Sequence, residues 1–562
     1  MTIQARWLRL RAGQSKDGGY VAVMVALLLM TLMSLAAFAV DVGHWYQVGQ
    51  REQGAADAAA LAGVTYLPAD STSAFSTALT FSQINGFQNG VNSTTVTPGL
   101  DGLPTRLKVT VKQQVNNFFG SLLGVPSTTV ARTAVAAYAG PVPMGSPCNG
   151  FANDPDPTST TNRSANCTST SQFWANIGSL GQTKSSGDAY QDTVCASGVD
   201  GCTGSVNTDL DPNGYTYTVT VTAPVTKLKI QVFDPAQVDV GDHCTLNNLS
   251  AASLLPAAKT VSVAPDPATR YATGDGAWCT GDRNGGDPTL LNITRFTIHG
   301  LGTNPWDPVS WPLQTNCGTA PGTENLGAQN PKTFKPYDAD LSLVLNTTTP
   351  QNHSRPDVAY NFRQWVDLCT IPGTIQPGTY AVQVDTSVPG GDGGHNRFAL
   401  RAFGTGASDK DNISVAGFDK MGIFANFTGT TQFYLARVPS TAAGQILNVR
   451  LFDVGDGATG GTITILKPAE STAASSTLSN CAATGSISQL NAALPTCSLS
   501  VNATYNGGRW QNIAVPIPST YACSDALTTG CWVMLKYDYQ GNPADATSWT
   551  ASIQGDPVRL VQ

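Results

Sequence analysis

Charged residues are scarce in this sequence: they make up 12% of its 562 residues, and the formal net charge is -7. A nucleic-acid footprint needs a concentrated basic face, so this composition excludes one. Coiled-coil heptads and collagen repeats are also missing. Glycine (56) and proline (34) are plentiful, which is typical of β-sandwiches joined by long polar loops. The length predicts about three or four domains.

Histidine is rare as well, with only five in the chain: His44, His243, His299, His353 and His395. No HExxH pair, GxSxG elbow, P-loop or Rossmann glycine pattern occurs in a fitting context. His395 lies in the glycine-rich GGDGGHNRF, which indicates a hairpin loop rather than a catalytic base. We therefore expect no enzyme. The alternative is a hydrolase whose carboxylates are brought together only by folding.

Cysteine is absent before Cys148, and all twelve cysteines follow it. No CxxC pair flanked by histidine occurs, so a zinc site is not expected. An even number of cysteines beside a membrane segment favours disulfides in an oxidising compartment, with free thiols as the alternative. The short spacings predict locally closed loops, and the disulfide candidates are Cys195, Cys202, Cys481, Cys497, Cys523 and Cys531.

One long apolar run is present, YVAVMVALLLMTLMSLAAFAV, from Tyr20 to Val40. It has no charge and matches the hydrocarbon thickness of a bilayer. We expect a retained single-pass anchor over 20–42, with a signal peptide cleaved at Ala37-Phe38-Ala39 as the alternative. Asp41 follows the run, and four basic residues precede it: Arg6, Arg9, Arg11 and Lys16. The positive-inside rule then predicts a cytoplasmic N-terminus and an exported remainder.

No proline follows the apolar run until Pro68, and most residues between are good helix formers, which predicts one helix from about Tyr20 to Leu67. Its second half has a face of small residues at helical spacing: Ala55, Ala58, Ala59 and Ala62. Small side chains let another backbone or sheet approach closely. We expect this face to pack on the protein's own module or on a neighbouring helix, and alanine bias alone is the other interpretation.

After Pro68 the pattern changes to a short helix, an alternating strand RLKVTVKQQV, a helical turn and a second alternating strand. The order GGYVAVMVALLLM, AVDVGHWY, QGAADAAALAG and VTVKQQVNNFFGSLLGVPSTTVARTAVAAY resembles the N-terminal region of TadG-like proteins of the tight-adherence (Flp) pilus-assembly group. The resemblance covers about the first 140 residues. It matches at Asp41, Gly43, Ala55 to Gly63, Val109, Val111, Phe119, Gly124, Ala134 and Val135.

The resemblance implies a protein of the bacterial cell membrane that takes part in assembling or anchoring a Flp/Tad-type pilus or related surface apparatus. Its implied partners are the lipid membrane and pilin-like or other pilus-assembly proteins. Relatives processed as pilins carry a glutamate about five residues into the mature helix. The residues after Gly19 here are YVAVMV, without a glutamate, so we do not expect processing and polymerisation as a pilin subunit. A von Willebrand A domain is not expected either, because Pro389 replaces the second serine of a DxSxS site beginning at Asp385.

The remainder contains many short strand-like runs divided by Gly, Pro, Asn and Asp turns, which predicts two β-sandwiches. KLKIQVFDP (227–235) and ILNVRLFDV (446–454) are interpreted as equivalent strands of the two, and the first sandwich holds an insertion between Asp234 and Pro331. The predicted fold class is an α+β membrane-anchored module, with a long pilin-like helix and a small sheet, followed by two β-sandwich domains. The expected divisions are a basic tail (1–19), a transmembrane helix (20–42), the extracytoplasmic helix and α/β module (43–140), a disulfide-containing linker (141–204), and sandwiches over 205–408 and 409–562.

One turn could bind an ion. DLDPNG contains Asp209, Asp211 and Asn213 and matches the first half of an EF-hand loop, so these three residues are candidate calcium ligands. The twelfth position would be Thr220 rather than glutamate, and an ordinary Asx-rich turn is the alternative. The acidic turn DVGDG at 453–457 has the same two interpretations, a calcium site or an ordinary turn. No other cofactor is expected.

The alternative function is a surface adhesin or glycan-binding protein that uses the same anchor. Glycan binding would need aromatic side chains gathered on an exposed sandwich face, and four tryptophans are available for it: Trp306, Trp311, Trp510 and Trp532.

Overall fold

The structure is a computed structural model. It describes residues 18–67, 71–101, 103–138, 141–154, 161–165, 167, 173–233, 293–302, 307–317, 332–334, 365–387, 394–425, 429–452, 461–468, 477–524, 530–539, 545–554 and 558–561. These residues divide into two compact units. Unit 1 comprises 1–67, 71–138 and 558–562, and unit 2 comprises 139–557 with 68–70.

Unit 1 is built on the helix α1 (Gly18–Val64), which is 47 residues long. At about 1.5 Å per residue it is about 70 Å long. Its N-terminal half, from Tyr20 to Val42, is exposed almost throughout, whereas its C-terminal half packs on the rest of the unit. α2 (Ser71–Ile84) follows after a turn. The expected unbroken helix and the short helix after it are thus both present.

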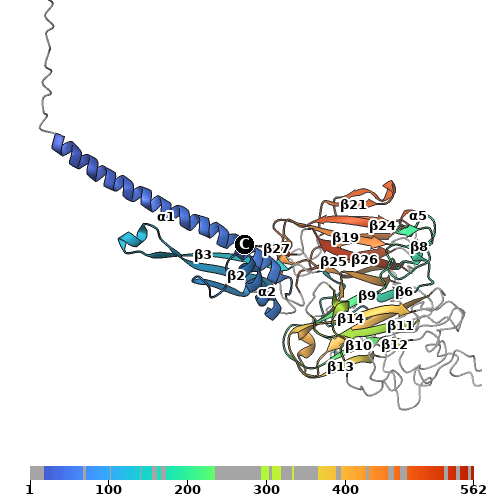
Figure 1. Ribbon diagram of the computed structural model, residues 1–562. Coiled ribbons are helices and arrows are strands. Elements are labelled where there is room, and N and C mark those ends of the chain that lie inside the picture. The colour runs from blue at the N-terminus through green and yellow to red at the C-terminus, as the bar shows by residue number, and fades with distance from the viewer. Residues whose placement is uncertain are drawn as a thin grey trace, which may run out of the picture. The chain divides into compact units, whose positions relative to one another are not determined.

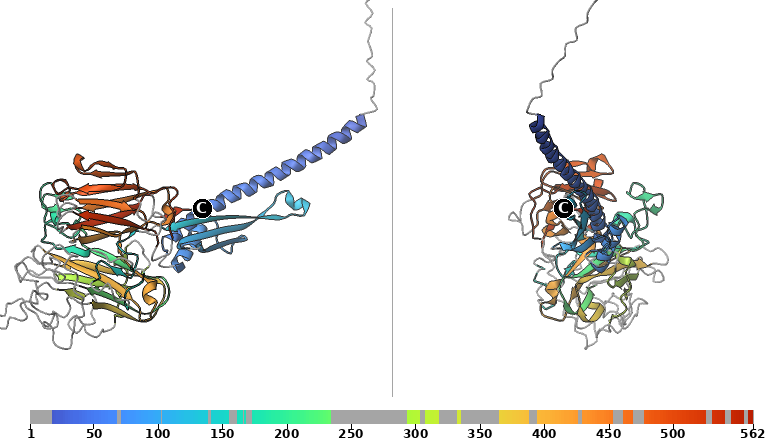
Figure 2. Two further views of the ribbon diagram at one scale, coloured as in Figure 1. Left: turned by 180° about the vertical axis from the view of Figure 1, so that it is seen from behind. Right: turned by 60° about the vertical axis from the view of Figure 1, so that its left-hand side comes forward.

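A four-stranded antiparallel sheet completes unit 1, in the order β1-β2-β3-β27. The first three strands are β1 (Thr94–Asp101), β2 (Leu103–Asn116) and β3 (Ser127–Tyr138). The hairpin β2–β3 runs beside the C-terminal half of α1, and the N-terminal half of α1 extends beyond the hairpin tip (Figures 1 and 2). The fourth strand, β27 (Val558–Leu560), comes from the far end of the sequence and pairs with β3. Unit 2 is therefore inserted into unit 1 between β3 and β27.

Unit 2 consists mainly of two large antiparallel sheets. In the first, the order is β13 (Trp365–Ile375), β10 (Val225–Phe233), β15 (His395–Phe403), β6 (Trp174–Gly178), β17 (Lys420–Ala425), β26 (Asp545–Ile553), β19 (Ile446–Phe452), β24 (Trp510–Pro516), β21 (Cys481–Gly485) and β22 (Ala492–Leu494), with β5 (Gly150–Phe151) on β15. In the second, it is β12 (Lys332–Phe334), β11 (Ile293–His299), β14 (Gly378–Ser387), β9 (Tyr215–Val221), β16 (Ile413–Phe418), β4 (Pro143–Met144), β18 (Gly429–Arg437), β25 (Trp532–Tyr539), β20 (Gly461–Leu466) and β23 (Ser498–Val501).

Small elements connect these strands. A two-stranded ribbon joins β7 (Cys202–Thr203) to β8 (Val206–Asn207). Among the described residues of unit 2 the short helices are η2 (Lys184–Ser186), η4 (Pro308–Ser310), η7 (Asp409–Asn412), η8 (Ser440–Ala442), η9 (Ser488–Leu490) and α5 (Ala503–Asn506), and η1 (Gly120–Leu123) lies between β2 and β3 of unit 1.

The two large sheets pack face to face over one continuous core. Aromatic pairs connect the layers: Tyr217 of β9 lies 5.9 Å from Phe398 of β15, between ring centroids, and Tyr537 of β25 lies 6.2 Å from Trp549 of β26. Burial alternates along strands such as β19 and β20, which place one face in this core, whereas β6 and β17 are buried along their whole length. A long N-terminal helix followed by β-sandwich architecture confirms the predicted fold class.

The two strand series of unit 2 have the same topology. In the first sheet β13-β10-β15 corresponds to β24-β19-β26, and in the second β11-β14-β9 corresponds to β20-β25-β18. KLKIQVF and ILNVRLF, which form most of β10 and all of β19, therefore occupy equivalent positions. Figure 1 shows the earlier strands in green to yellow and the later ones in orange to red.

The domain boundaries predicted from sequence differ from those observed. β16 follows the predicted boundary at 408/409, yet it pairs with β9 of the first series, while β4 pairs with β18 of the second. The two series are halves of one unit rather than separate domains. The segment 141–204 is not a linker, because its described residues supply β4, β5 and β6 to the two sheets. Its Pro, Ser and Asn content concealed these strands, which are only two to five residues long.

One glycine of α1 is expected to control the packing of unit 1. A Cβ at Gly63 would lie 2.5 Å from the Ala74 carbonyl oxygen and 2.5 Å from Leu107 Cδ2, whereas a Cβ at Gly54 on the same helix would meet nothing within 4 Å. Gly63→Ala should therefore destabilise unit 1 by about 1–3 kcal/mol through overpacking. Gly54→Ala, the matched control, should stabilise the helix by about 0.5–1 kcal/mol. Thermal unfolding compares the two, and equal midpoints would contradict the close approach.

Candidate functional site

The junction between the exposed and packed halves of α1 is held by Asp41. Its carboxylate accepts backbone hydrogen bonds from Phe118 (2.8 Å), Phe119 (3.2 Å) and Gly120 (2.7 Å), at the start of η1 in the β2–β3 tip. One turn further along α1, Trp45 Nε1 donates to Asn117 Oδ1 at 2.8 Å. Four residues of one short loop are thus connected to α1 just after its uncharged run.

The alanine face of α1 packs within unit 1. Ala55 and Ala59 are buried, and Ala58 and Ala62 are half-buried. Ala56 and Ala60, which sequence reasoning missed, are also fully buried. The buried arc is wider than one stripe because α2 contacts α1 alongside β2 and β3. The sequence does indicate this wider face, because the adjacent alanines Ala55-Ala56 and Ala59-Ala60 place small residues on two adjoining faces of the helix.

A buried acid lies on the same part of α1. Glu52 is fully buried, and neither of its carboxylate oxygens has a hydrogen-bond partner. Burial raises the pKa of Glu52 to about 7, and the positive charge of Arg132 only partly offsets this. Glu52 is thus protonated in the folded protein under mildly acidic conditions.

The two carboxylates among the candidate calcium ligands form ion pairs with lysines of the same protein. Asp209 accepts hydrogen bonds from Lys184 Nζ (2.7 Å) and Trp510 Nε1 (2.8 Å) through one oxygen. Asp211 forms an ion pair with Lys420 and accepts the backbone N–H of Asn213 at 2.9 Å. Each carboxylate therefore has its own lysine, an arrangement that supports an Asx turn with ion pairs. The second motif, 453–457, lies outside the described residues.

Gly214 ends this turn for two physical reasons. Its φ is +72°, and a Cβ there would lie 2.0 Å from the carbonyl oxygen of Val384. Only glycine combines the left-handed backbone with so close an approach to β14. The glycine that suggested an EF-hand loop is thus explained by packing between the turn and a strand.

Histidines and acids do not gather elsewhere in the part of the chain that the structure describes. There, no group of three or more His, Cys, Asp or Glu residues could hold a metal ion. His299 is buried, with Nδ1 at 2.9 Å from the Trp311 carbonyl oxygen and Nε2 at 3.1 Å from Gln383 Oε1. His44 packs on the ring of Phe118, with centroids 4.9 Å apart, and His395 begins β15. His243 and His353 lie outside the described residues.

Disulfides close short loops of unit 2. The six candidate cysteines pair as Cys195–Cys202, Cys481–Cys497 and Cys523–Cys531, and two further bonds are Cys148–Cys167 and Cys317–Cys369. The last two were not anticipated as pairs, because their separations of 19 and 52 residues do not single out a partner. Among the described cysteines none is free.

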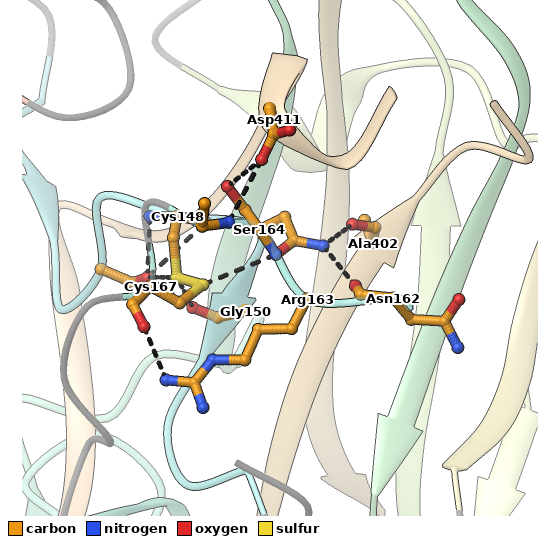
Figure 3. The surroundings of a disulfide bond; sticks show 11 residues. Cys148, Gly150, Asn162, Arg163, Ser164, Cys167, Ala402 and Asp411 are labelled. Carbon is orange, nitrogen blue, oxygen red and sulfur yellow. Dashed lines mark hydrogen bonds between the residues drawn. A yellow bond between two sulfur atoms is a disulfide. The ribbon is translucent and has the colours of Figure 1, made fainter. Parts of the chain in front are cut away.

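The Cys148–Cys167 bond closes a loop, and hydrogen bonds beside it attach this loop to neighbouring elements (Figure 3). Asn149 Nδ2 donates to the carbonyl oxygens of Asn162 (2.8 Å) and Ala402 (2.7 Å). Ser164 Oγ donates to Asp411 Oδ1 at 2.7 Å. A pocket beside this bond has a volume of about 30 Å³, which is room for one or two water molecules. The disulfide and these hydrogen bonds together hold this loop against β15 and η7.

Three of the four tryptophans proposed for glycan binding are not exposed, so they form no platform on a sandwich face. Trp311, Trp510 and Trp532 are all buried, and Trp306 lies outside the described residues. Trp510 packs against Tyr190 and Phe452, with ring centroids 5.9 Å and 5.3 Å away.

The helix α1 indicates a membrane-anchored protein. It is long and apolar enough to cross a membrane, and none of its most apolar stretch is buried against the rest of the protein. Residues 19–66 match the family model Tad, "Putative Flp pilus-assembly TadE/G-like". The match covers the whole of α1 from Gly19 and confirms the TadG-like resemblance in the N-terminal region. Comparison with curated proteins and with solved structures gives no match.

The Lys184–Asp209 pair should be important for the stability of unit 2. Lys184 is fully buried, and burial lowers its pKa while Asp209 opposes that shift. Asp209→Asn leaves this ammonium without its carboxylate and should cost about 3 kcal/mol in thermal unfolding. Asp538→Asn is the control, because Asp538 forms an exposed pair with Lys536 at 3.8 Å and should cost about 0–1 kcal/mol. Equal losses of stability in the two variants would show that the Lys184–Asp209 pair contributes no more than an exposed ion pair.

Glu52 should make the stability of unit 1 depend on pH. Between the ordinary pKa of 4.5 and the folded value of about 7, the folded state binds more protons than the unfolded state. Stability should therefore fall as pH rises through this window, by up to about 3 kcal/mol. Glu52→Gln should remove the decline and be the more stable form above pH 7. Parallel pH profiles of unfolding for the two proteins would contradict the assignment.

Proposed function

We propose that the protein is a single-pass, non-enzymatic membrane protein that takes part in assembling or anchoring a Flp/Tad-type pilus or related surface apparatus. The observation that carries this proposal is the coincidence of the TadE/G-like match at 19–66 with one continuous helix, α1. The apolar half of that helix is bare, and its alanine-rich half is the scaffold of a folded module. A helix of this kind connects a bilayer rigidly to an external domain.

The proposed orientation has the N-terminus in the cytoplasm and both units outside. Arg6, Arg9, Arg11 and Lys16 precede the uncharged run, as the positive-inside rule requires. The disulfides of unit 2 support the same direction, because such bonds persist in oxidising compartments.

Unit 2 is the part proposed to contact other components. The alanine face is occupied by α2, β2 and β3, so packing within unit 1 already satisfies it. Unit 2 joins unit 1 at both ends of its main segment, since the chain leaves after β3 and returns to β27. These two covalent connections limit how far unit 2 can move away from unit 1 when a bound partner pulls on it.

Mild cross-linking of whole cells followed by purification of the full-length protein from membranes tests this role. Recovery of pilin and secretion-machinery subunits is the expected result, because an assembly factor must contact them. Recovery of the protein alone would favour a free-standing adhesin and overturn the proposal. Gly54→Ala and Gly63→Ala provide matched variants: the first should retain the partners, and the second should lose them if unit 1 must be intact.

A further inference from the structure

The tip of the β2–β3 hairpin exposes an apolar surface beside the membrane helix. Four large apolar side chains of the tip face solvent: Phe118 (60% exposed), Phe119 (42%), Leu122 (82%) and Val125 (52%). No ionisable residue occurs in the hairpin between Lys112 and Arg132. So much uncovered apolar surface in one short uncharged loop is unfavourable in water.

The position of this tip along α1 is fixed by hydrogen bonds. Asp41, the first charged residue after the uncharged run, accepts the backbone N–H groups of Phe118, Phe119 and Gly120. Trp45 and Asn117 form a second connection at 2.8 Å. The tip therefore lies at the level where the apolar surface of α1 ends.

The length of bare helix before the tip matches a bilayer. The 23 residues of α1 from Gly18 to Val40 are about 34 Å long at 1.5 Å per residue. The hydrocarbon core of a bilayer is about 30 Å thick. A bilayer that covers this stretch has its outer boundary at Asp41, and so at the tip. His44, Trp45 and Tyr46 follow there, and Trp and Tyr are the side chains that favour membrane–water interfaces.

We propose that the hairpin tip, residues 117–126, is a second membrane-binding element that inserts its apolar side chains into the outer interface of the bilayer spanned by α1. Its ligand is the lipid headgroup and upper acyl region. The proposal rests on the membrane anchoring proposed above. A single helix can rotate and tilt freely, whereas a helix and a loop bound to the same surface fix the orientation of unit 1. The Asp41 carboxylate is satisfied by three N–H groups, which lets a charged residue lie at this depth.

Lipid quenching of site-specific labels tests this proposal in the full-length protein. Leu122→Cys is labelled with a small fluorophore, and the oxidised protein is reconstituted into phosphatidylcholine–phosphatidylglycerol vesicles. Leu100→Cys is the matched control, because Leu100 is also an exposed leucine (48%) but lies in β1, where it pairs with Leu107 near the end of β2 that is away from the tip. Brominated lipid should quench the Leu122 label several-fold more than the Leu100 label, and aqueous iodide should quench in the reverse order.

Each other outcome has a definite meaning. Iodide quenching as strong at Leu122 as at Leu100, without lipid quenching, would overturn the proposal. Protection of Leu122 from both quenchers would mean that a second copy covers the tip, which also overturns it. A third label at Leu28, within the uncharged run, tests the anchor separately. If lipid quenches Leu28 but not Leu122, only the tip proposal fails; if lipid quenches neither, the anchor fails with it.

Discussion

The close packing of the small-residue face of α1 against its own sheet is the contact on which the architecture of unit 1 depends. Ala55, Ala56, Ala59 and Ala60 are buried there, and Gly63 lets α1 approach the backbone of α2. Alanine contributes little apolar area for each residue, so stability comes from the close fit of many backbone and side-chain atoms. One continuous helix can therefore be bare where lipid is expected and packed where the module begins.

A second constraint is topological. β27 completes the sheet of unit 1 only after the chain has built the whole of unit 2. Within unit 2, β4 and β16 each pair with the strand series that does not follow them directly in the chain. These exchanged strands join two similar halves into continuous sheets with a common core, so the halves are expected to unfold together rather than one by one.

The polar clusters of unit 2 are structural in character. Asp209, Asp211 and Asn149 each fasten a loop to a strand through lysine, tryptophan or backbone partners. Such buried networks favour one arrangement of long loops over many others, because an unpaired group in the interior is costly.

Local patterns in the sequence were enough to predict the helix α1, its bare apolar half, the two strands of the β2–β3 hairpin and the mainly β character of the rest. Each depends on periodicity or on residues close in the chain, and the TadE/G-like block is equally local. Only the tertiary structure decided that Asp41 holds the hairpin tip 77 residues further on, that β27 closes unit 1, and that 141–204 joins two half-sandwiches. It also showed lysines beside the two acids of DLDPNG. These contacts connect residues far apart in sequence, and no periodicity within a single segment records which distant partner its backbone or charge will meet.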